Sequence, residues 1–153
     1  MIVGTPREAL WAFINARIGV PWSSDFRAVG LVRGDLLCAA AGYNGFMGRA
    51  CFMHGAIDDR SAIDRTFVRA IFEYPFDQCG VRYIFVAVDE QNQRSLNFCY
   101  RSGFELHDTL PGGAEMGSER SLLLLRMTRD QCRWLRSRDG KISTGSAGLP
   151  ESN

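Results

Sequence analysis

The sequence predicts an α/β (α+β) fold, with helices covering the faces of a mixed, mostly antiparallel sheet. Three observations support this prediction. Two stretches have apolar residues at helical spacing, around 5–17 and 62–72. Three β-branched and apolar runs lie between these two helices, separated by turn residues. Finally, a strand, a short helix ended by glycine and another strand follow one another over 81–106. A chain of 153 residues suits one domain with a real core.

The first helix is expected to run from Thr5 to about Arg17. Thr5 suits an N-cap, and Pro6 is well tolerated at the first helical position. Leu10 and Ile14 continue the apolar stripe. The few residues before Thr5 leave room for only a short strand, or none.

A meander of three strands is predicted next, over 26–32, 36–43 and 49–57. The turns are placed at Gly34-Asp35 and at Asn44-Gly45, since Asn-Gly is a strong hairpin signal. The meander is therefore antiparallel.

The second helix is predicted over 62–72, extending at most to Gln78. Pro75 lacks an amide hydrogen and crowds the carbonyl four residues earlier, so it should end or kink this helix. The strand that follows, 81–88, should be parallel to the strand at 49–57, through a right-handed crossover.

The remaining elements are a helix over 93–102, strands over 104–110 and 120–127, and a short helix over 128–135. The later residues are polar and lack periodicity. We therefore expect one domain over 1–136 and a disordered tail over 137–153.

The composition narrows the function classes. Lys+Arg 18 against Asp+Glu 17 gives a net charge of +1, which argues against general binding to nucleic acid or anionic membranes. Five scattered cysteines without a CxxC pair predict neither a disulfide framework nor a metal site, and suit a reducing cytoplasm. We expect no secretory signal, since Met1 leads straight into Gly4, Pro6 and a charged helix start, and no apolar run approaches about 18 residues.

The most specific pattern is VRYIFVAVDEQNQRSLNFCYRSGFEL, over 81–106. This strand–Asn–helix–Gly-Phe unit resembles the C-terminal half of the acetyl-CoA-binding core of the GNAT superfamily of N-acetyltransferases. The resemblance covers roughly Phe26 to Leu135. Residues 72–82 are similar to the ribosomal-protein-acetyltransferase-like branch, and 129–135 resemble the end of some bacterial and phage-associated members.

The resemblance implies that the strands at 49–57 and 81–88 splay apart around the pantetheine arm of acetyl-CoA. Backbone groups of the first of these strands would then contact pantetheine and the thioester carbonyl, the expected residues being Met53, Gly55, Ala56 and Ile57. The alternative is that this segment only packs against its neighbours. Gly55 inside a strand suits a bulge or close ligand approach.

The resemblance also places the pyrophosphate at the loop that opens the second helix. The family usually carries Gln/Arg-x-x-Gly-x-Gly/Ala there, but this chain has no glycine at that point. Arg60, Ser61 and Arg65 would contact the phosphates, whereas Asp59 and Asp64 would oppose them. The alternative is an ordinary capped helix start without a ligand.

Asn92 matches the family's asparagine that contacts the cofactor, and Ser95 and Asn97 would face the cofactor too. Asn92 also suits the N-cap of the helix at 93–102. Many members use a tyrosine four residues before the glycine to protonate the departing thiolate. Cys99 occupies that position here and Tyr100 follows it, so either is a candidate acid, with burial of Cys99 in the core as the alternative.

His54 is the candidate general base, because the attacking amine must be neutral and histidine titrates near neutral pH. A structural histidine is the alternative, and His107 is a weaker candidate.

The sequence thus predicts transfer of an acetyl group from acetyl-CoA to an unidentified primary amine by direct attack in a ternary complex. A non-catalytic GNAT-fold binding or assembly protein with a degenerate CoA site is the alternative. The exposed late strands could pair two subunits. An RNA-associated role is a third, weaker hypothesis, and a solvated face explains its arginines equally well: Arg126, Arg129, Arg133 and Arg136.

Overall fold

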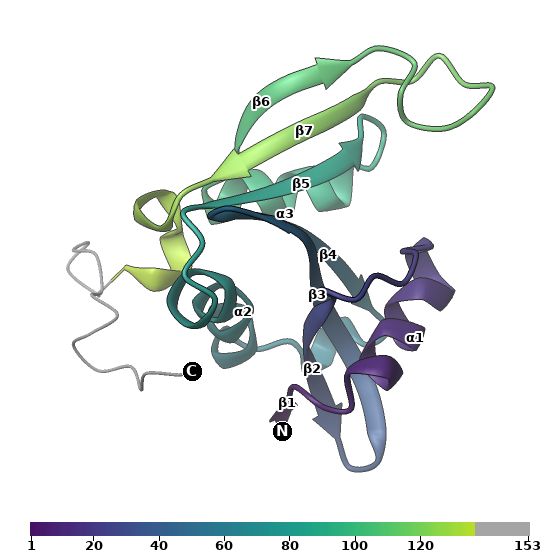
Figure 1. The fold of residues 1–153 in the computed structure, drawn as a ribbon. Coiled ribbons are helices and arrows are strands. Elements are labelled where there is room, and N and C mark those ends of the chain that lie inside the picture. The colour runs from purple at the N-terminus through teal and green to yellow at the C-terminus, as the bar shows by residue number, and fades with distance from the viewer. Residues whose placement is uncertain (137–153) are drawn as a thin grey trace.

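The computed structural model describes residues 1–136, and the tail predicted at 137–153 lies outside them. One sheet has the strand order β1-β2-β3-β4-β5-β7-β6 (Figure 1). Neighbouring strands are antiparallel, except for β4 and β5, which are parallel. This arrangement confirms the predicted mixed, mostly antiparallel sheet.

The helices and strands follow one another in the predicted order. They are β1 (Ile2–Val3), α1 (Arg7–Ile18), β2 (Arg27–Arg33), β3 (Leu36–Met47), β4 (Ala50–Ile57), α2 (Arg65–Glu73), β5 (Tyr83–Asp89), α3 (Gln93–Ser102), β6 (Glu105–Leu110) and β7 (Leu122–Met127). Short 3-10 turns precede α2 and follow β7, over Arg60–Ala62, Arg129–Gln131 and Arg133–Leu135. Within residues 1–136, no helix combines the length and apolar character needed to cross a membrane.

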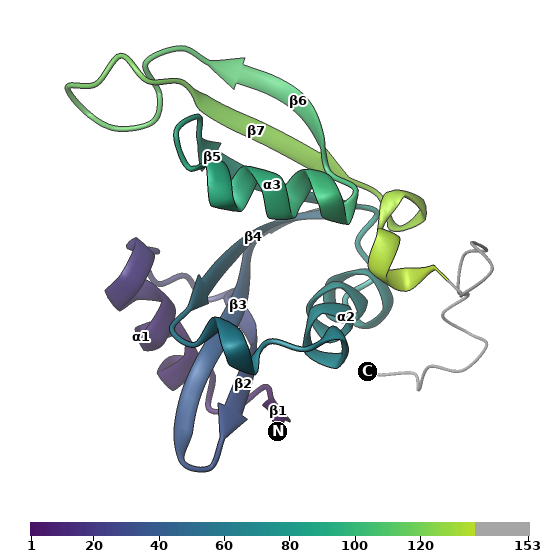
Figure 2. The same cartoon turned by 180° about the vertical axis from the view of Figure 1, so that it is seen from behind.

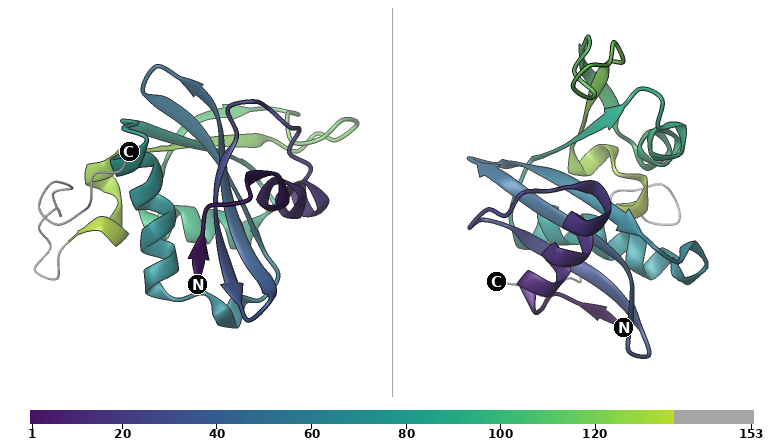
Figure 3. Two further views of the ribbon diagram at one scale, coloured as in Figure 1. Left: turned by 60° about the horizontal axis from the view of Figure 1, so that its bottom comes forward. Right: turned by 90° about the vertical axis from the view of Figure 1, so that its right-hand side faces the viewer.

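The helices cover opposite faces of the sheet, as predicted. On one face, Leu10 and Ile14 of α1 pack with the small residues Ala28, Ala40 and Ala56. The other face carries a larger core, to which α2 and α3 both contribute. Figure 3 (left) shows α1 and α2 on either side of β2 to β4, and Figure 2 shows α3 lying against β5 and β7.

Two predicted boundaries are wrong. Thr5 is not the N-cap of α1: Pro6 takes that place with extended backbone, and the helix begins at Arg7. Asn44-Gly45 is not the hairpin turn, because β3 continues to Met47, which pairs with Ala50. The ladder is irregular between Asn44 and Met47, so the Asn-Gly pair forms a bulge in which Gly45 has φ 64°.

The predicted last helix is instead a pair of 3-10 turns. The first is closed by Thr128 and Gln131, whose side chain accepts a hydrogen bond from the Thr128 amide at 2.8 Å. Cys132 then has extended backbone, with φ −75° and ψ 110°, which separates the two turns. Burial of Cys132 and Leu135 against the core fixes this path more strongly than helix propensity does.

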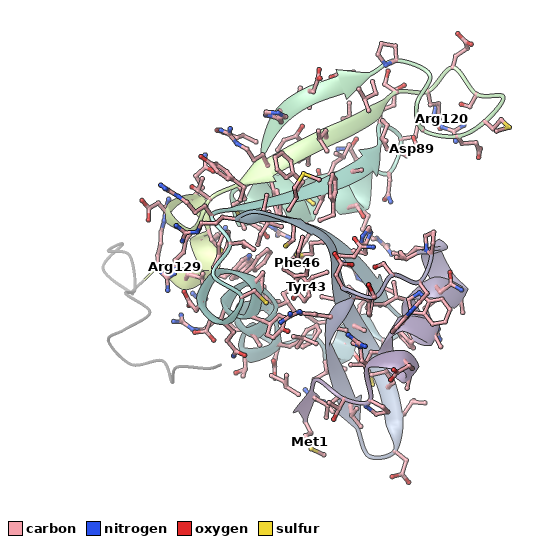
Figure 4. The ribbon with its side chains drawn as sticks, in the orientation of Figure 1. Met1, Tyr43, Phe46, Asp89, Arg120 and Arg129 are labelled. Atoms are coloured by element: carbon pink, nitrogen blue, oxygen red, sulfur yellow. The ribbon has the colours of Figure 1, made fainter. Side chains whose placement is uncertain are left out.

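Pro75 ends α2 as predicted, and Tyr43 compensates for it. The chain continues from α2 into a wider π-helical turn over Tyr74–Gln78. Since proline has no amide hydrogen, the carbonyl of Ile71 loses its helical donor. The Tyr43 hydroxyl donates to that carbonyl at 2.6 Å from the buried side of β3 (Figure 4). This bond fastens α2 to the strands that carry the candidate site.

Candidate active site

The parallel strands β4 and β5 separate, as the resemblance implied. They pair only at Ala50 with Tyr83, Cys51 with Ile84 and Phe52 with Phe85. Beyond these pairs β4 continues to Ile57 and β5 to Asp89, and the two strands diverge. A cavity of about 1010 Å³ opens along this gap, lined by residues from β4, β5, α2, α3 and the loop after α1.

The edge of β4 presents backbone groups to this cavity. The amides of Arg82 and Tyr83 donate to the Arg49 carbonyl on the β5 side, whereas the Asp58 amide donates to Cys38 on the β3 side. Backbone groups alternate between the two sides along a strand. The pair of Phe52 with Phe85 uses the Met53 N–H, so the C=O group of Met53 and the N–H and C=O groups of Gly55 and Ile57 face the gap beyond the last pair with β5. All three residues line the cavity.

Ala56 and Gly55 are adjacent in β4 but differ in whether they face the cavity. Ala56 is 4% exposed, packs beneath α1 and pairs with Ala40, so its backbone faces β3. It does not line the cavity. Gly55 has open space where a side chain would begin, which leaves room for a ligand close to the backbone.

His54 lies on the face of β4 opposite Met53 and lines the cavity, as the loop after α1 also does. Its Nε2 is 2.8 Å from Oδ1 of Asn44. That oxygen can only accept, so we assign the ring proton to Nε2 and a free lone pair to Nδ1. Burial lowers the pKa of His54 below its ordinary value of 6.5. The imidazole is therefore neutral at neutral pH, in the tautomer that a base requires.

The loop before α2 contains the departure from the family pattern. Asp64 caps α2, accepting from the Phe67 amide at 2.8 Å, and Asp59 accepts from the Ser61 amide at 3.0 Å. Carboxylates thus occupy amides that would otherwise attract phosphate. Arg60 lines the cavity, whereas Ser61 does not.

Arg65 also lies outside the cavity lining, with its guanidinium 5.7 Å from the centre of the Trp134 ring. A third carboxylate of this loop, Asp58, forms a two-pronged pair with Arg17 of α1, at 2.6 Å for both contacts. The pair lowers the pKa of Asp58, chiefly through the hydrogen bond from Arg17. The loop is thereby tied to α1.

On α3, Asn92 and Ser95 both line the cavity. Oδ1 of Asn92 accepts from the Ser95 amide at 3.2 Å, so Asn92 is the N-cap, which leaves its amide nitrogen available to a ligand. Gly103 ends the helix at φ 120°, and a Cβ there would collide with the Gln131 carbonyl. The glycine of the Gly-Phe pair is thus required by packing.

The two candidate acids are placed differently. Cys99 lines the cavity but is only 7% exposed, and burial raises the pKa of its thiol to about 12. Tyr100 is 45% exposed and lies outside the cavity lining. This position favours Cys99 over Tyr100 as the residue that faces the cavity.

Sequence reasoning missed several residues that line the cavity. Arg94 and Arg101 line it from α3, on the same stripe of the helix as Asn97, which the resemblance had already indicated. Their spacing could have indicated from the sequence that the two arginines share one face of the helix. Asn44 was missed as the partner of His54, because the sequence placed a turn at Asn44. The loop at 18–21 carried no signal.

The arginines behind the RNA hypothesis are mostly engaged by the protein itself. Arg129 pairs with Asp77 at 2.7 Å, and Arg126 pairs with Glu105 at 3.4 Å. The Arg133 guanidinium lies 5.3 Å from the centre of the Trp134 ring. Figure 4 shows Arg129 directed toward the end of α2. These contacts favour structural roles over a basic stripe.

Comparison with known proteins gave matches at the level of structure. No protein-family model matches the chain, and no curated protein matches its sequence. A single-residue mutant of the spermidine N-acetyltransferase SpeG from Vibrio cholerae superposes with a TM-score of 0.71 at 13% identity, covering 88% of this chain and 97% of that chain. Mutant forms of the spermidine/spermine N-acetyltransferase SpeG from the same organism give 0.70 at 12% identity, covering 84% of this chain and 93% of that chain.

A dodecameric structure of the Vibrio cholerae spermidine N-acetyltransferase gives a TM-score of 0.68 at 13% identity, covering 84% of this chain and 92% of that chain. At such identities the likeness establishes the fold. Together with the separated β4–β5 pair, it shows that this chain has the fold of the GNAT N-acetyltransferases.

Proposed function

We propose that the protein is an acetyl-CoA-dependent N-acetyltransferase that moves an acetyl group to a primary amine by direct attack in a ternary complex. The observation that carries this proposal is the gap between β4 and β5, where Met53, Gly55 and Ile57 turn unpaired backbone groups toward a large cavity. The pantetheine arm of acetyl-CoA lies in this gap and pairs with that edge. Asn92 and Ser95 contact the cofactor from the start of α3.

The transfer needs one base and one site for the oxyanion. The amine nitrogen attacks the thioester carbon, and a β4 backbone amide donates to the oxygen that becomes negative. His54 Nδ1 accepts the proton released from the amine. The C–N bond forms as the C–S bond breaks, and CoA leaves as the thiolate.

Cys99 is a poor acid for that thiolate. A thiol has an ordinary pKa of about 8.5, whereas burial raises the pKa of Cys99 to about 12. Proton transfer from Cys99 would run uphill by roughly 5 kcal/mol. The thiolate therefore takes its proton from solvent, and Cys99 contributes an apolar wall.

The cavity lining favours an acceptor with a single amine over a polyamine, although the structural neighbours are spermidine acetyltransferases. A polycation needs carboxylates around it, and Asp89 is the only carboxylate lining the described cavity. Arg120 already pairs with Asp89 at 3.0 Å (Figure 4). The other lining residues from this side of the chain, 18–21, Ala40, Ala41 and Asn44, carry no charge. A single amine on a peptide N-terminus, a lysine or a small molecule fits this wall.

Finer assignments are part of the same proposal. The resemblances at 72–82 and 129–135 support our assignment of the chain to the ribosomal-protein-acetyltransferase-like, phage-associated branch, and we propose that it acts in the cytoplasm. The exposed edge strand β6 would pair two subunits.

A specific observation favours the alternative, a non-catalytic GNAT-fold binding or assembly protein. Asp59 and Asp64 occupy the amides where the family binds phosphate, and Cys99 stands in place of the family's tyrosine. An assay with radiolabelled acetyl-CoA separates the two. Acceptors would include peptides with free N-termini, lysine peptides and small amines, with spermidine as the contrasting acceptor.

We expect labelled product with at least one single-amine acceptor and none with spermidine. Tight acetyl-CoA binding without transfer to any acceptor would favour the non-catalytic alternative. Absence of both binding and transfer would contradict the proposed function.

A further inference from the structure

The walls of the cavity carry arginines that the protein leaves unpaired. Within residues 1–136, four arginine side chains have no hydrogen bond, ion pair or ring contact: Arg60, Arg82, Arg94 and Arg101. Three of the four, all except Arg82, line the cavity. Unpaired guanidinium groups gathered on one cavity are suited to an anion.

Their arrangement suits an extended anion. Arg94 and Arg101 lie on one stripe of α3, about 10 Å apart along the helix axis, and Asn97 lies between them. Arg60 lies on the other side, in the 3-10 turn before α2. Arg120 neutralises Asp89, the carboxylate of the lining, so the balance on these walls is positive.

These arginines can also compensate for the capped start of α2, where few backbone amides are free to bind phosphate. Asp59 and Asp64 take up backbone amides and add negative charge where a diphosphate would normally rest. An arginine side chain binds phosphate oxygens through two parallel hydrogen bonds. Arginines can therefore hold a phosphate group where the backbone amides are already occupied. The apolar lining beside α3, including Phe98, Val86 and Ile71, suits an uncharged arm that ends in an anionic group.

We propose that Arg60, Arg94 and Arg101 bind the phosphate groups of the CoA thioester, in place of the glycine loop that this chain lacks. The inference rests on the proposed function for the identity of the ligand. The phosphates lie between α3 and the turn before α2, and the thioester extends from there toward β4.

Calorimetry with three probes tests the proposal. The probes are acetyl-CoA, acetyl-pantetheine, which lacks the phosphates, and adenosine 3′,5′-bisphosphate, which lacks the arm. The variant is Arg94→Gln/Arg101→Gln, with Arg60→Gln measured separately. Arg82→Gln is the matched control, since Arg82 is also exposed and unpaired but lies outside the cavity. Circular dichroism melting confirms that each variant folds.

The double variant should weaken acetyl-CoA and adenosine 3′,5′-bisphosphate about 100-fold, since each charged hydrogen-bonding group contributes about tenfold or more. Its affinity for acetyl-pantetheine should not change. Arg60→Gln should weaken the two phosphate probes about tenfold, and Arg82→Gln should leave all three probes unaffected.

Unchanged acetyl-CoA affinity in the double variant would overturn the proposal. So would failure of wild-type protein to bind adenosine 3′,5′-bisphosphate. A different result would contradict the proposed function. If the protein bound the bisphosphate through the arginines but did not bind acetyl-pantetheine, the arginine site would be confirmed and the transferase function rejected. A third outcome would assign these arginines to RNA instead. In that case the wild-type protein would bind RNA but not adenosine 3′,5′-bisphosphate, and the double variant would lose the RNA binding.

Discussion

His54 and Asn44 form the pair on which the proposed proton transfer depends. The hydrogen bond at 2.8 Å fixes the ring, and burial holds the pKa below 6.5. The neutral base is present above that lowered pKa and is lost as pH falls through it. The kcat/KM profile should therefore show an acid limb below pH 6.5.

His54→Gln should lower kcat about 100-fold and remove this acid limb. His107→Gln is the matched control, because His107 lies on exposed β6 outside the cavity lining and should keep the wild-type profile. An acid limb that persists in His54→Gln would remove His54 from the mechanism.

Tyr43 illustrates how one hydroxyl compensates for a proline. Tyr43→Phe would leave the Ile71 carbonyl buried without a donor, at about 1–3 kcal/mol of unfolding free energy. Urea denaturation measures this loss. Tyr83→Phe serves as the comparison, since Tyr83 is 37% exposed and should change stability by less than about 0.5 kcal/mol. Equal stabilities of the two variants would contradict the role assigned to Tyr43.

At the scale of elements, local patterns predicted most strands and helices, because apolar periodicity reflects which face is buried. These local patterns gave a wrong prediction where pairing between strands decides whether a segment is a turn or part of a strand. Asn44-Gly45 has the chemistry of a turn, yet β3 stays paired with β4 as far as Met47, and the pair becomes a bulge. That one error hid the partner of His54, since Asn44 faces His54 only when both strands continue past it.

The same contrast applies to the site. The β4 edge and the start of α3 followed from a sequence resemblance, whereas the convergence of Arg60 with Arg94 and Arg101 depends on how α2 and α3 pack together. No local signal joins residues so far apart in the chain.

Asp64 at the start of α2 both caps the helix and carries a negative charge, and one substitution separates these two effects. Serine caps helices about as well as aspartate. Asp64→Ser should therefore keep the unfolding free energy within about 0.5 kcal/mol, while removing a negative charge near the expected phosphates. We expect acetyl-CoA to bind several-fold more tightly, as measured by calorimetry. Weaker binding would mean that the α2 tip does not face the phosphates.

At the scale of the whole molecule, the cavity lies where the two parts of the sheet diverge, β1 to β4 on one side and β5 to β7 on the other (Figure 1). A ligand that bridges them should stabilise the entire fold. Acetyl-CoA at 100 times its Kd should add about 2.7 kcal/mol, which corresponds to a Tm rise of about 5–10 °C. Scanning calorimetry measures the rise. Spermidine is the comparison ligand and should produce no shift.

The most direct test of the central claim is a crystal structure of the protein with bound acetyl-CoA. The account predicts the pantetheine arm between β4 and β5, hydrogen-bonded to backbone groups of Met53, Gly55 and Ile57, with the thioester beside His54. Acetyl-CoA bound at another surface, or β4 and β5 paired along their full length, would contradict it.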